Sequence, residues 1–72
     1  MDITQNIRAI EVLKSNLLAE VAFLFEIMAY AKAEPDQKEE ILSEIIALSY
    51  MLGEKLGTDL AKLEELVNAK LE

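Results

Sequence analysis

Glu20 is the side chain whose setting most suggests chemistry, because it interrupts the apolar stretch LLAEVAFLFEIMAYA, residues 17–31. The only other charge in that stretch is Glu26. The chain has no His and no Cys and only two Gly, which excludes the serine and cysteine triads, the common zinc sites and the glycine-rich phosphate loops. A structural interpretation stays open, in which Glu20 is a partly buried polar group bonded to a Lys or Tyr of a neighbouring helix.

Two further kinds of side chain could bind a nucleotide. Arg8 is the only arginine and could clamp a phosphate, although an ion pair with Glu11, three residues on, is the simpler expectation. Aromatic rings could stack on a base, but packing in a core or an interface is the role that aromatic residues more often have. The four aromatic residues are Phe23, Phe25, Tyr30 and Tyr50.

The elements that must position these groups are helices. Apolar residues recur at steps of three and four, and the breaks fall at Pro35 and Gly57, which predicts an all-α domain over residues 1–72. The first helix is expected from Ile3 to about Ala31, and the second, antiparallel to it, ends near Leu56. A short third helix begins after Gly57. Expected helix caps are Asp2 with Gln5, Asp36 with Glu39 or Pro35 as the first helical residue, Gly57 as a left-handed cap, and Thr58.

Apolar residues cover more than one side of the first helix. One set forms the expected core stripe, which consists of Ile3, Ile7, Ile10, Leu13, Leu17, Val21, Leu24 and Met28. It is expected to meet Ile41, Ile45, Leu48 and Leu52 of the second helix, while Leu60, Leu63, Val67 and Leu71 of the third point inward. A second face of the first helix remains, and it contains Val12, Ala19, Phe23, Ile27 and Tyr30. A domain this small is marginal alone, so we expect a second copy to cover this face, giving a four-helix-bundle homodimer or a dimer of dimers.

The segment EEILSEIIALSYMLGEKLGTDL, residues 39–60, resembles the second half of the MazG-like, all-α nucleoside triphosphate pyrophosphohydrolases. In that family an acidic E-E-L-x-D segment enters an apolar helix that ends in L-G-[ILT]-D-L. The opening NIRAIEVLKSNLL, residues 6–18, is similar to that of a short MazG-like subgroup. The resemblance covers nearly the whole chain.

The resemblance implies a Mg²⁺ site made of two acidic pairs, E-x-x-E on one helix and E-x-x-D on the next, which binds the phosphates of a nucleotide. Glu20 and Glu44 fall on one position of each pair, with Glu40 one turn before Glu44 as a third candidate ligand. The partner positions hold Leu17 or Phe23 for the first pair and Ile41 for the second. Lys70 falls on the family's closing Lys-Leu pair, and Asn68 stands two residues before it rather than three; both are candidates for nucleotide binding. For Glu44, a solvated place on the helix flank is the alternative.

Charge and hydropathy narrow the class of partner. Seven basic residues stand against fourteen acidic ones, which disfavours nucleic acid and anionic membrane surfaces. The N-terminus lacks the pattern of a signal peptide and no apolar run is long enough to span a bilayer, so we expect a cytoplasmic protein. Because each acidic pair retains only one carboxylate, we favour a non-catalytic or vestigial role through self-association. The alternative is a Mg²⁺-dependent pyrophosphohydrolase or nucleotide-binding protein, and an adaptor that docks a larger partner through Phe23, Ile27 and Tyr30 is a third hypothesis.

Overall fold

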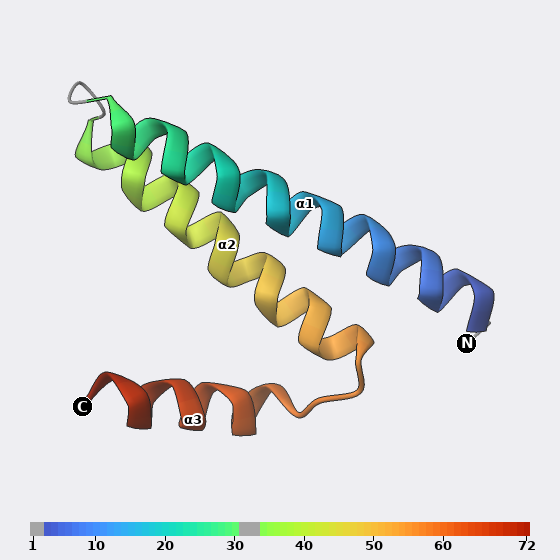
Figure 1. The fold of residues 1–72 in the computed structure, drawn as a ribbon. Coiled ribbons are helices and arrows are strands. Elements are labelled where there is room, and N and C mark those ends of the chain that lie inside the picture. The colour runs from blue at the N-terminus through green and yellow to red at the C-terminus, as the bar shows by residue number, and fades with distance from the viewer. Residues whose placement is uncertain (1–2, 31–33) are drawn as a thin grey trace.

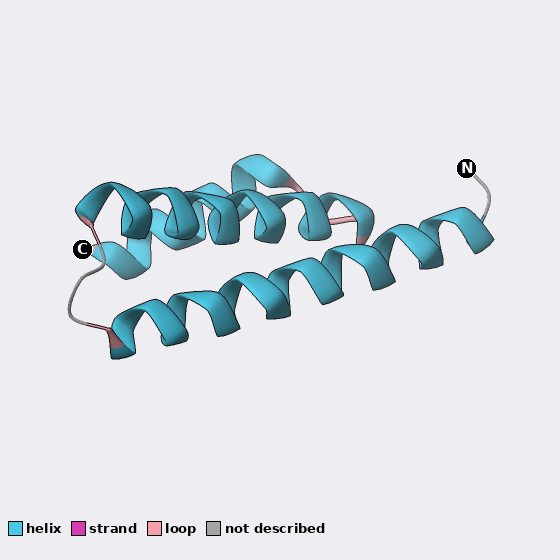
Figure 2. Ribbon diagram, turned by 90° about the horizontal axis from the view of Figure 1, so that it is seen from above, coloured by secondary structure: helices cyan, strands magenta, loops and turns pink. Residues whose placement is uncertain are grey.

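The computed structural model describes residues 3–30 and 34–72 of the chain. Three helices follow one another, α1 (Ile3–Ala29), α2 (Pro35–Lys55) and α3 (Leu60–Leu71) (Figure 1). The described residues contain helices and loops but no strand (Figure 2). The predicted all-α class and the order of two long helices and a short one are therefore confirmed. The expected cap at Asp2 lies outside the described residues, and the first helix ends at Ala29, two residues before the expected end at Ala31.

The start of α2 shows which of the two expected beginnings is used. Pro35 is the first helical residue and Glu34 is the N-cap, which confirms the role of Pro35, whose missing N–H costs nothing at this position. The expected capping box of Asp36 and Glu39 is wrong. Instead, the backbone N–H of Glu34 donates to Oε1 of Gln37 at 3.2 Å, because the true cap lies two residues earlier in the chain.

The end of α2 is a complete Schellman motif around Gly57. The N–H of Thr58 donates to the carbonyl of Gly53 at 2.9 Å, and the N–H of Gly57 donates to the carbonyl of Glu54 at 3.1 Å. Gly57 has φ of 83°, which confirms the left-handed cap. The prediction that Thr58 caps α3 is wrong, because its hydroxyl donates to the carbonyl of Gly53 at 2.8 Å. Asp59 is the cap instead, since its Oδ1 accepts from the N–H of Ala61 at 2.8 Å.

Replacing Gly57 with Ala is expected to destabilise the protein by about 1–2 kcal/mol, the cost of a left-handed residue with a Cβ. Apart from Gly57 and its two neighbours in the chain, no atom lies within 4 Å of the position that this Cβ would take, so the cost comes from the backbone conformation alone. Thermal unfolding followed by circular dichroism at fixed protein concentration measures it. Gly57→Asn is the control, because Asn tolerates this conformation. Equal losses for Ala and Asn would contradict the interpretation.

The core lies in the contact between α1 and α2. The buried apolar residues are Ile27 on α1 and Ile41 and Leu48 on α2. On α1 the stripe that faces α2 has steps of four and three and consists of Leu13, Leu17, Glu20, Leu24 and Ile27, all buried or half-buried. Asn6 fixes the far end of the hairpin, because its side-chain amide donates to the carbonyl of Lys55 at 3.2 Å.

This stripe differs from the expected one at several positions. Ile7 and Met28 are 55% and 65% exposed, whereas both were expected in the core. Val21 is half-buried, as expected, but Met28 is exposed and Ile27, one residue before it, is buried. Ile27 was expected on the uncovered second face, and that placement is wrong because Ile27 lies against α2.

The helices form one thin layer with α2 in the middle. Within the described residues α3 packs on α2 alone, and of its expected inward residues only Leu63 is half-buried. The molecule measures 45 × 31 × 14 Å, and its radius of gyration is 14.4 Å, against about 11 Å for a compact domain of this length. No described side chain is completely enclosed. A single layer leaves both of its broad sides open to solvent.

Candidate functional site

Glu20 lies in the middle of α1, on the side that faces α2. Its neighbours along the stripe are Leu17 and Leu24, and its side chain is half-buried. Among the described residues the Glu20 carboxylate has no hydrogen-bond or ion-pair partner, so the expected bond to a Lys or Tyr is not found. No side-chain oxygen of the described residues is buried without a partner, so the Glu20 carboxylate reaches solvent at the edge of the contact. It is therefore open to a cation or a polar group from outside the chain.

Glu44 and Glu40 lie on α2 and are both exposed. Each residue of a helix turns by about 100°, which puts Glu44 about 70° from the centre of the α1-facing stripe of α2, and Glu40 about 40° further. Glu44 thus flanks the stripe on the same side as Met51. The described residues contain no group of three or more acidic side chains that could hold a metal ion.

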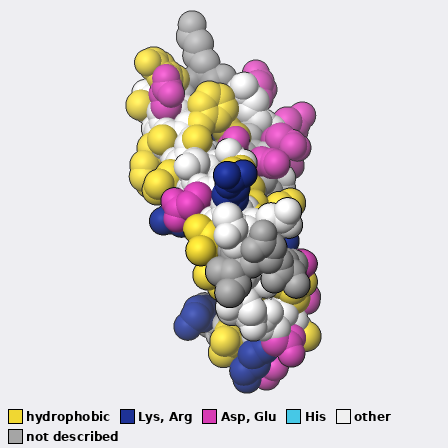
Figure 3. Space-filling view, turned by 90° about the vertical axis from the view of Figure 1, so that its right-hand side faces the viewer, with side chains coloured by type: hydrophobic (Ala, Val, Ile, Leu, Met, Phe, Trp, Pro, Cys, Tyr) yellow, Lys and Arg dark blue, Asp and Glu magenta, His cyan; other side chains and the backbone are white. Residues whose placement is uncertain are grey.

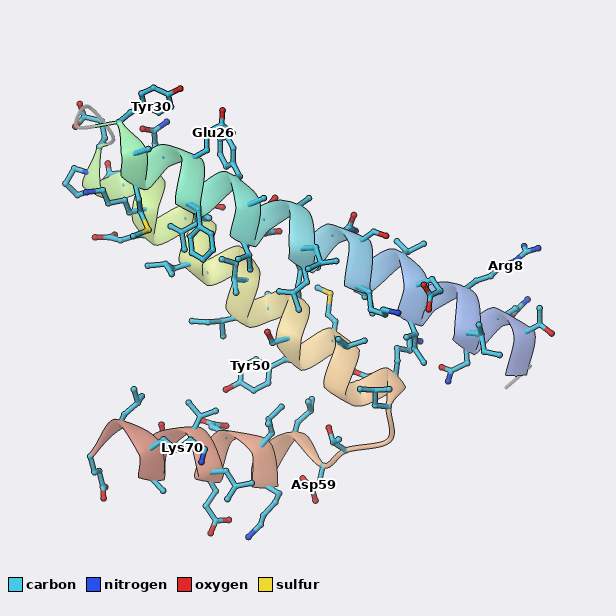
Figure 4. The ribbon with its side chains drawn as sticks, viewed as in Figure 1. Arg8, Glu26, Tyr30, Tyr50, Asp59 and Lys70 are labelled. Carbon is cyan, nitrogen blue, oxygen red and sulfur yellow. The ribbon has the colours of Figure 1, made fainter. Side chains whose placement is uncertain are left out.

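The two candidate nucleotide-binding residues are on α3. Asn68 and Lys70 are both exposed, and α3 touches α2 but not α1 within the described part of the chain. Figure 4 shows Lys70 on a helix that is separated from α1 by α2. The fold of one chain therefore keeps these residues two helices away from the stripe that contains Glu20.

Arg8 does not form the expected ion pair with Glu11. Glu11 is instead 3.1 Å from the ammonium group of Lys14, three residues on, and Arg8 has no ion-pair partner among the described residues. Arg8 and Lys55 line a shallow groove of about 480 Å³ between α1 and the end of α2. Most of the remaining lining is apolar, and it includes Ala9, Val12, Leu13 and Met51, with Glu54 as the one acidic member.

The broad side of the molecule next to this groove is rich in apolar groups. Val12, Phe23 and Tyr30 of α1 are 58%, 48% and 65% exposed, and Met51 of α2 is 51% exposed. We call these four residues the Phe23 face. Figure 3 shows that exposed hydrophobic side chains gather over the upper part of the molecule. Four of the five residues expected on the second apolar face of the first helix, all except Ile27, are thus uncovered in a single chain.

Sequence reasoning missed a second group of exposed apolar residues on α1. Ile7, Leu18 and Phe25 are all more than half exposed, and the turn of about 100° per residue puts them on the flank opposite the Phe23 face. The same arithmetic applied to the sequence could have found them, but Ile7 had been given to the core stripe. They provide matched control positions for experiments on the Phe23 face.

No span suited to a membrane is present, because none of the helices in residues 3–30 and 34–72 is both long and apolar enough to cross one.

Comparison with known proteins gives one informative result. The model of the MazG-like family matches residues 3–72. Neither the curated proteins nor the solved structures give a significant match. The family match covers both halves of the α1–α2 hairpin and all of α3, so it agrees with the all-helical fold and with the motifs in residues 6–18 and 39–60. The chain belongs to the MazG-like family.

Proposed function

We propose that this MazG-like protein has a non-catalytic or vestigial role and acts through self-association, with a second copy covering the Phe23 face. The observation that carries the proposal is the excess of exposed surface. The chain exposes 5827 Å², whereas a folded monomer of 8.1 kDa exposes about 4,500 Å². The difference of about 1,300 Å² exceeds the roughly 800 Å² that each partner buries in a standard interface. Sedimentation velocity over a range of concentrations tests the association, and a monomer throughout would overturn it.

The loss of catalysis rests on the residues that stand at the family's acidic positions. The partner position of the first acidic pair holds Leu17 or Phe23, and that of the second holds Ile41; an apolar side chain cannot bind Mg²⁺. Within one chain, each acidic pair is therefore reduced to a single carboxylate.

A direct assay of hydrolysis tests this part of the proposal. Purified protein with Mg²⁺ and each common nucleoside triphosphate is expected to release no pyrophosphate above the rate without protein. Glu20→Gln is expected to leave that result unchanged. A Mg²⁺-dependent activity that is lost in Glu20→Gln but kept in Glu11→Gln, which removes an exposed charge from the same helix, would overturn the non-catalytic role.

The second candidate function is a Mg²⁺-dependent pyrophosphohydrolase or a nucleotide-binding protein. The observation that favours it is the position of Glu20, a half-buried residue whose carboxylate has no partner in the described residues. Glu44 would be the second ligand, with carboxylates from another copy completing the set that Mg²⁺ prefers. Calorimetric titration with Mg²⁺ and a nucleotide at high concentration separates the candidates, because absence of heat counts against this one.

A further inference from the structure

We propose that two copies of this chain pair their α1 helices antiparallel, in a register centred on Val21. This proposal rests on the self-association proposed above and specifies its geometry. It begins from six exposed residues separated by steps of four and three. Five of them lie on α1, and the sixth, Tyr30, directly follows this helix. They are Val12, Asn16, Ala19, Phe23, Glu26 and Tyr30, and we call them the α1 seam.

The α1 seam lies on the correct side of the helix for a bundle. With a turn of about 100° per residue, its centre is about 110° around α1 from the stripe that faces α2. A helix at the corner of a four-helix bundle contacts two neighbours in directions close to a right angle. Figure 4 shows Arg8, Glu26 and Tyr30 projecting from the side of α1 that faces away from α2. The α1 seam is thus free to meet a second helix while α2 keeps its place.

The order of residues along the α1 seam is self-complementary. The steps of four, three, four, three and four read the same in both directions, so a reversed second copy places residue i against residue 42 − i. Val12 then lies against the partner's Tyr30, and Ala19 against the partner's Phe23, which sets a small side chain against a large one. A two-fold interface requires this kind of match, because each surface patch must fit itself.

Charge also favours the reversed direction. Glu26 is the only charged residue of the α1 seam, and in the antiparallel register it lies against the partner's Asn16, whose amide group donates to carboxylates. In a parallel pair Glu26 would lie against the partner's Glu26, and like charges across a helix pair are destabilising. Arg8 lies one turn before Val12, next to the partner's Tyr30, where a guanidinium can stack on the ring.

A second copy is also the occupant that the area favours. The surplus surface of about 1,300 Å² per chain is more than the roughly 800 Å² that one partner of a standard dimer buries, and a groove of about 480 Å³ lies beside Val12. A net charge of −7 opposes the approach of an acidic partner over most of the surface, but the α1 seam itself is almost uncharged.

Disulfide cross-linking tests the register, because the natural chain has no cysteine. The double variant Val12→Cys/Tyr30→Cys is expected to convert to a covalent dimer under mild oxidation, judged by a non-reducing gel and intact mass. Each single variant is expected to stay uncross-linked, because 18 helical residues span about 27 Å and a disulfide needs Cα atoms roughly 5.5–6 Å apart. The matched control is Ile7→Cys/Phe25→Cys, with the same separation on the opposite flank and similar exposure.

Each result decides something. Cross-linking of the Val12→Cys single variant would overturn the antiparallel direction. A double variant that sediments as a dimer but does not cross-link, or that cross-links no more than the Ile7/Phe25 control, would overturn the register. Both results leave the proposed self-association intact. A natural chain that sediments as a monomer would overturn that proposal, and this inference with it. Circular dichroism confirms that each variant keeps the helical content of the natural chain.

Discussion

Phe23→Asp is expected to weaken the association of two copies by about 10²- to 10⁴-fold. Burying one large apolar side chain contributes roughly 1.5–3 kcal/mol, and a symmetric pair loses two of them, roughly 3–6 kcal/mol in all. The introduced carboxylate would also have to leave water in order to remain in the interface. Sedimentation velocity over a dilution series measures the dissociation constant.

Phe25→Asp is the matched control for this prediction. Phe25 is two residues away on the same helix and is even more exposed, 62% against 48% for Phe23, but it lies on the opposite flank. We expect its dissociation constant to stay close to that of the natural chain. Equal effects of the two substitutions would show that the Phe23 face has no special part in association, and a larger effect at Phe25 would place the interface on the flank with Ile7 and Leu18.

Ile27→Ala is expected to destabilise the fold by about 2–5 kcal/mol, the usual cost of truncating a large core side chain. Ile27 is one of the three buried apolar residues of the described chain, and a domain of 72 residues has only about 4–11 kcal/mol of stability in total. The variant should therefore unfold at a much lower urea concentration, which far-ultraviolet circular dichroism at fixed protein concentration measures.

Leu18→Ala is the control for the core prediction. Leu18 is 70% exposed, so its truncation is expected to change the free energy of unfolding by no more than about 0.5 kcal/mol. One other outcome would restore the placement of Ile27 on the uncovered second face, which the sequence alone had favoured. If Ile27→Ala keeps the urea midpoint of unfolding but weakens association, then Ile27 belongs to the contact between copies and not to the hairpin core.

The number and order of the helices could be predicted because their ends depend on local chemistry. Pro35 can only begin a helix and Gly57 adopts a backbone conformation that other residues resist. The adjacent residues were harder, since Thr58 and Asp59 are both good caps. Which of them caps α3 depends on the carbonyl of Gly53, a group that the sequence pattern does not place.

The faces of α1 could be predicted only in part. Hydrophobicity selects Val21 and Met28 for the core, but only Val21 is half-buried; Ile27 is buried in place of Met28, and Glu20 is half-buried although it is charged. The same limit applies to ion pairs. Arg8 and Lys14 are each three residues from Glu11, so the sequence offers two equivalent partners, and the conformations of the side chains decide between them.

The candidate metal ligands show where a family pattern stops being informative. Glu20 and Glu44 could be aligned with the family's acidic positions, but alignment does not indicate how far a side chain lies from the contact between helices. In the structure Glu20 lies within that contact and Glu44 beside it. The four residues of the Phe23 face were more accessible to sequence reasoning, because three of them follow from helical periodicity alone.

The thinness of the helical layer has a consequence for how this protein responds to dilution. The core of the hairpin is small, because no described side chain is fully enclosed, so a second copy bound as proposed would add to the chain's resistance to heat. By mass action, a folded state that forms only in pairs melts at a lower temperature as the chain becomes scarcer. Expression level would then determine how much of the protein is folded in the cell.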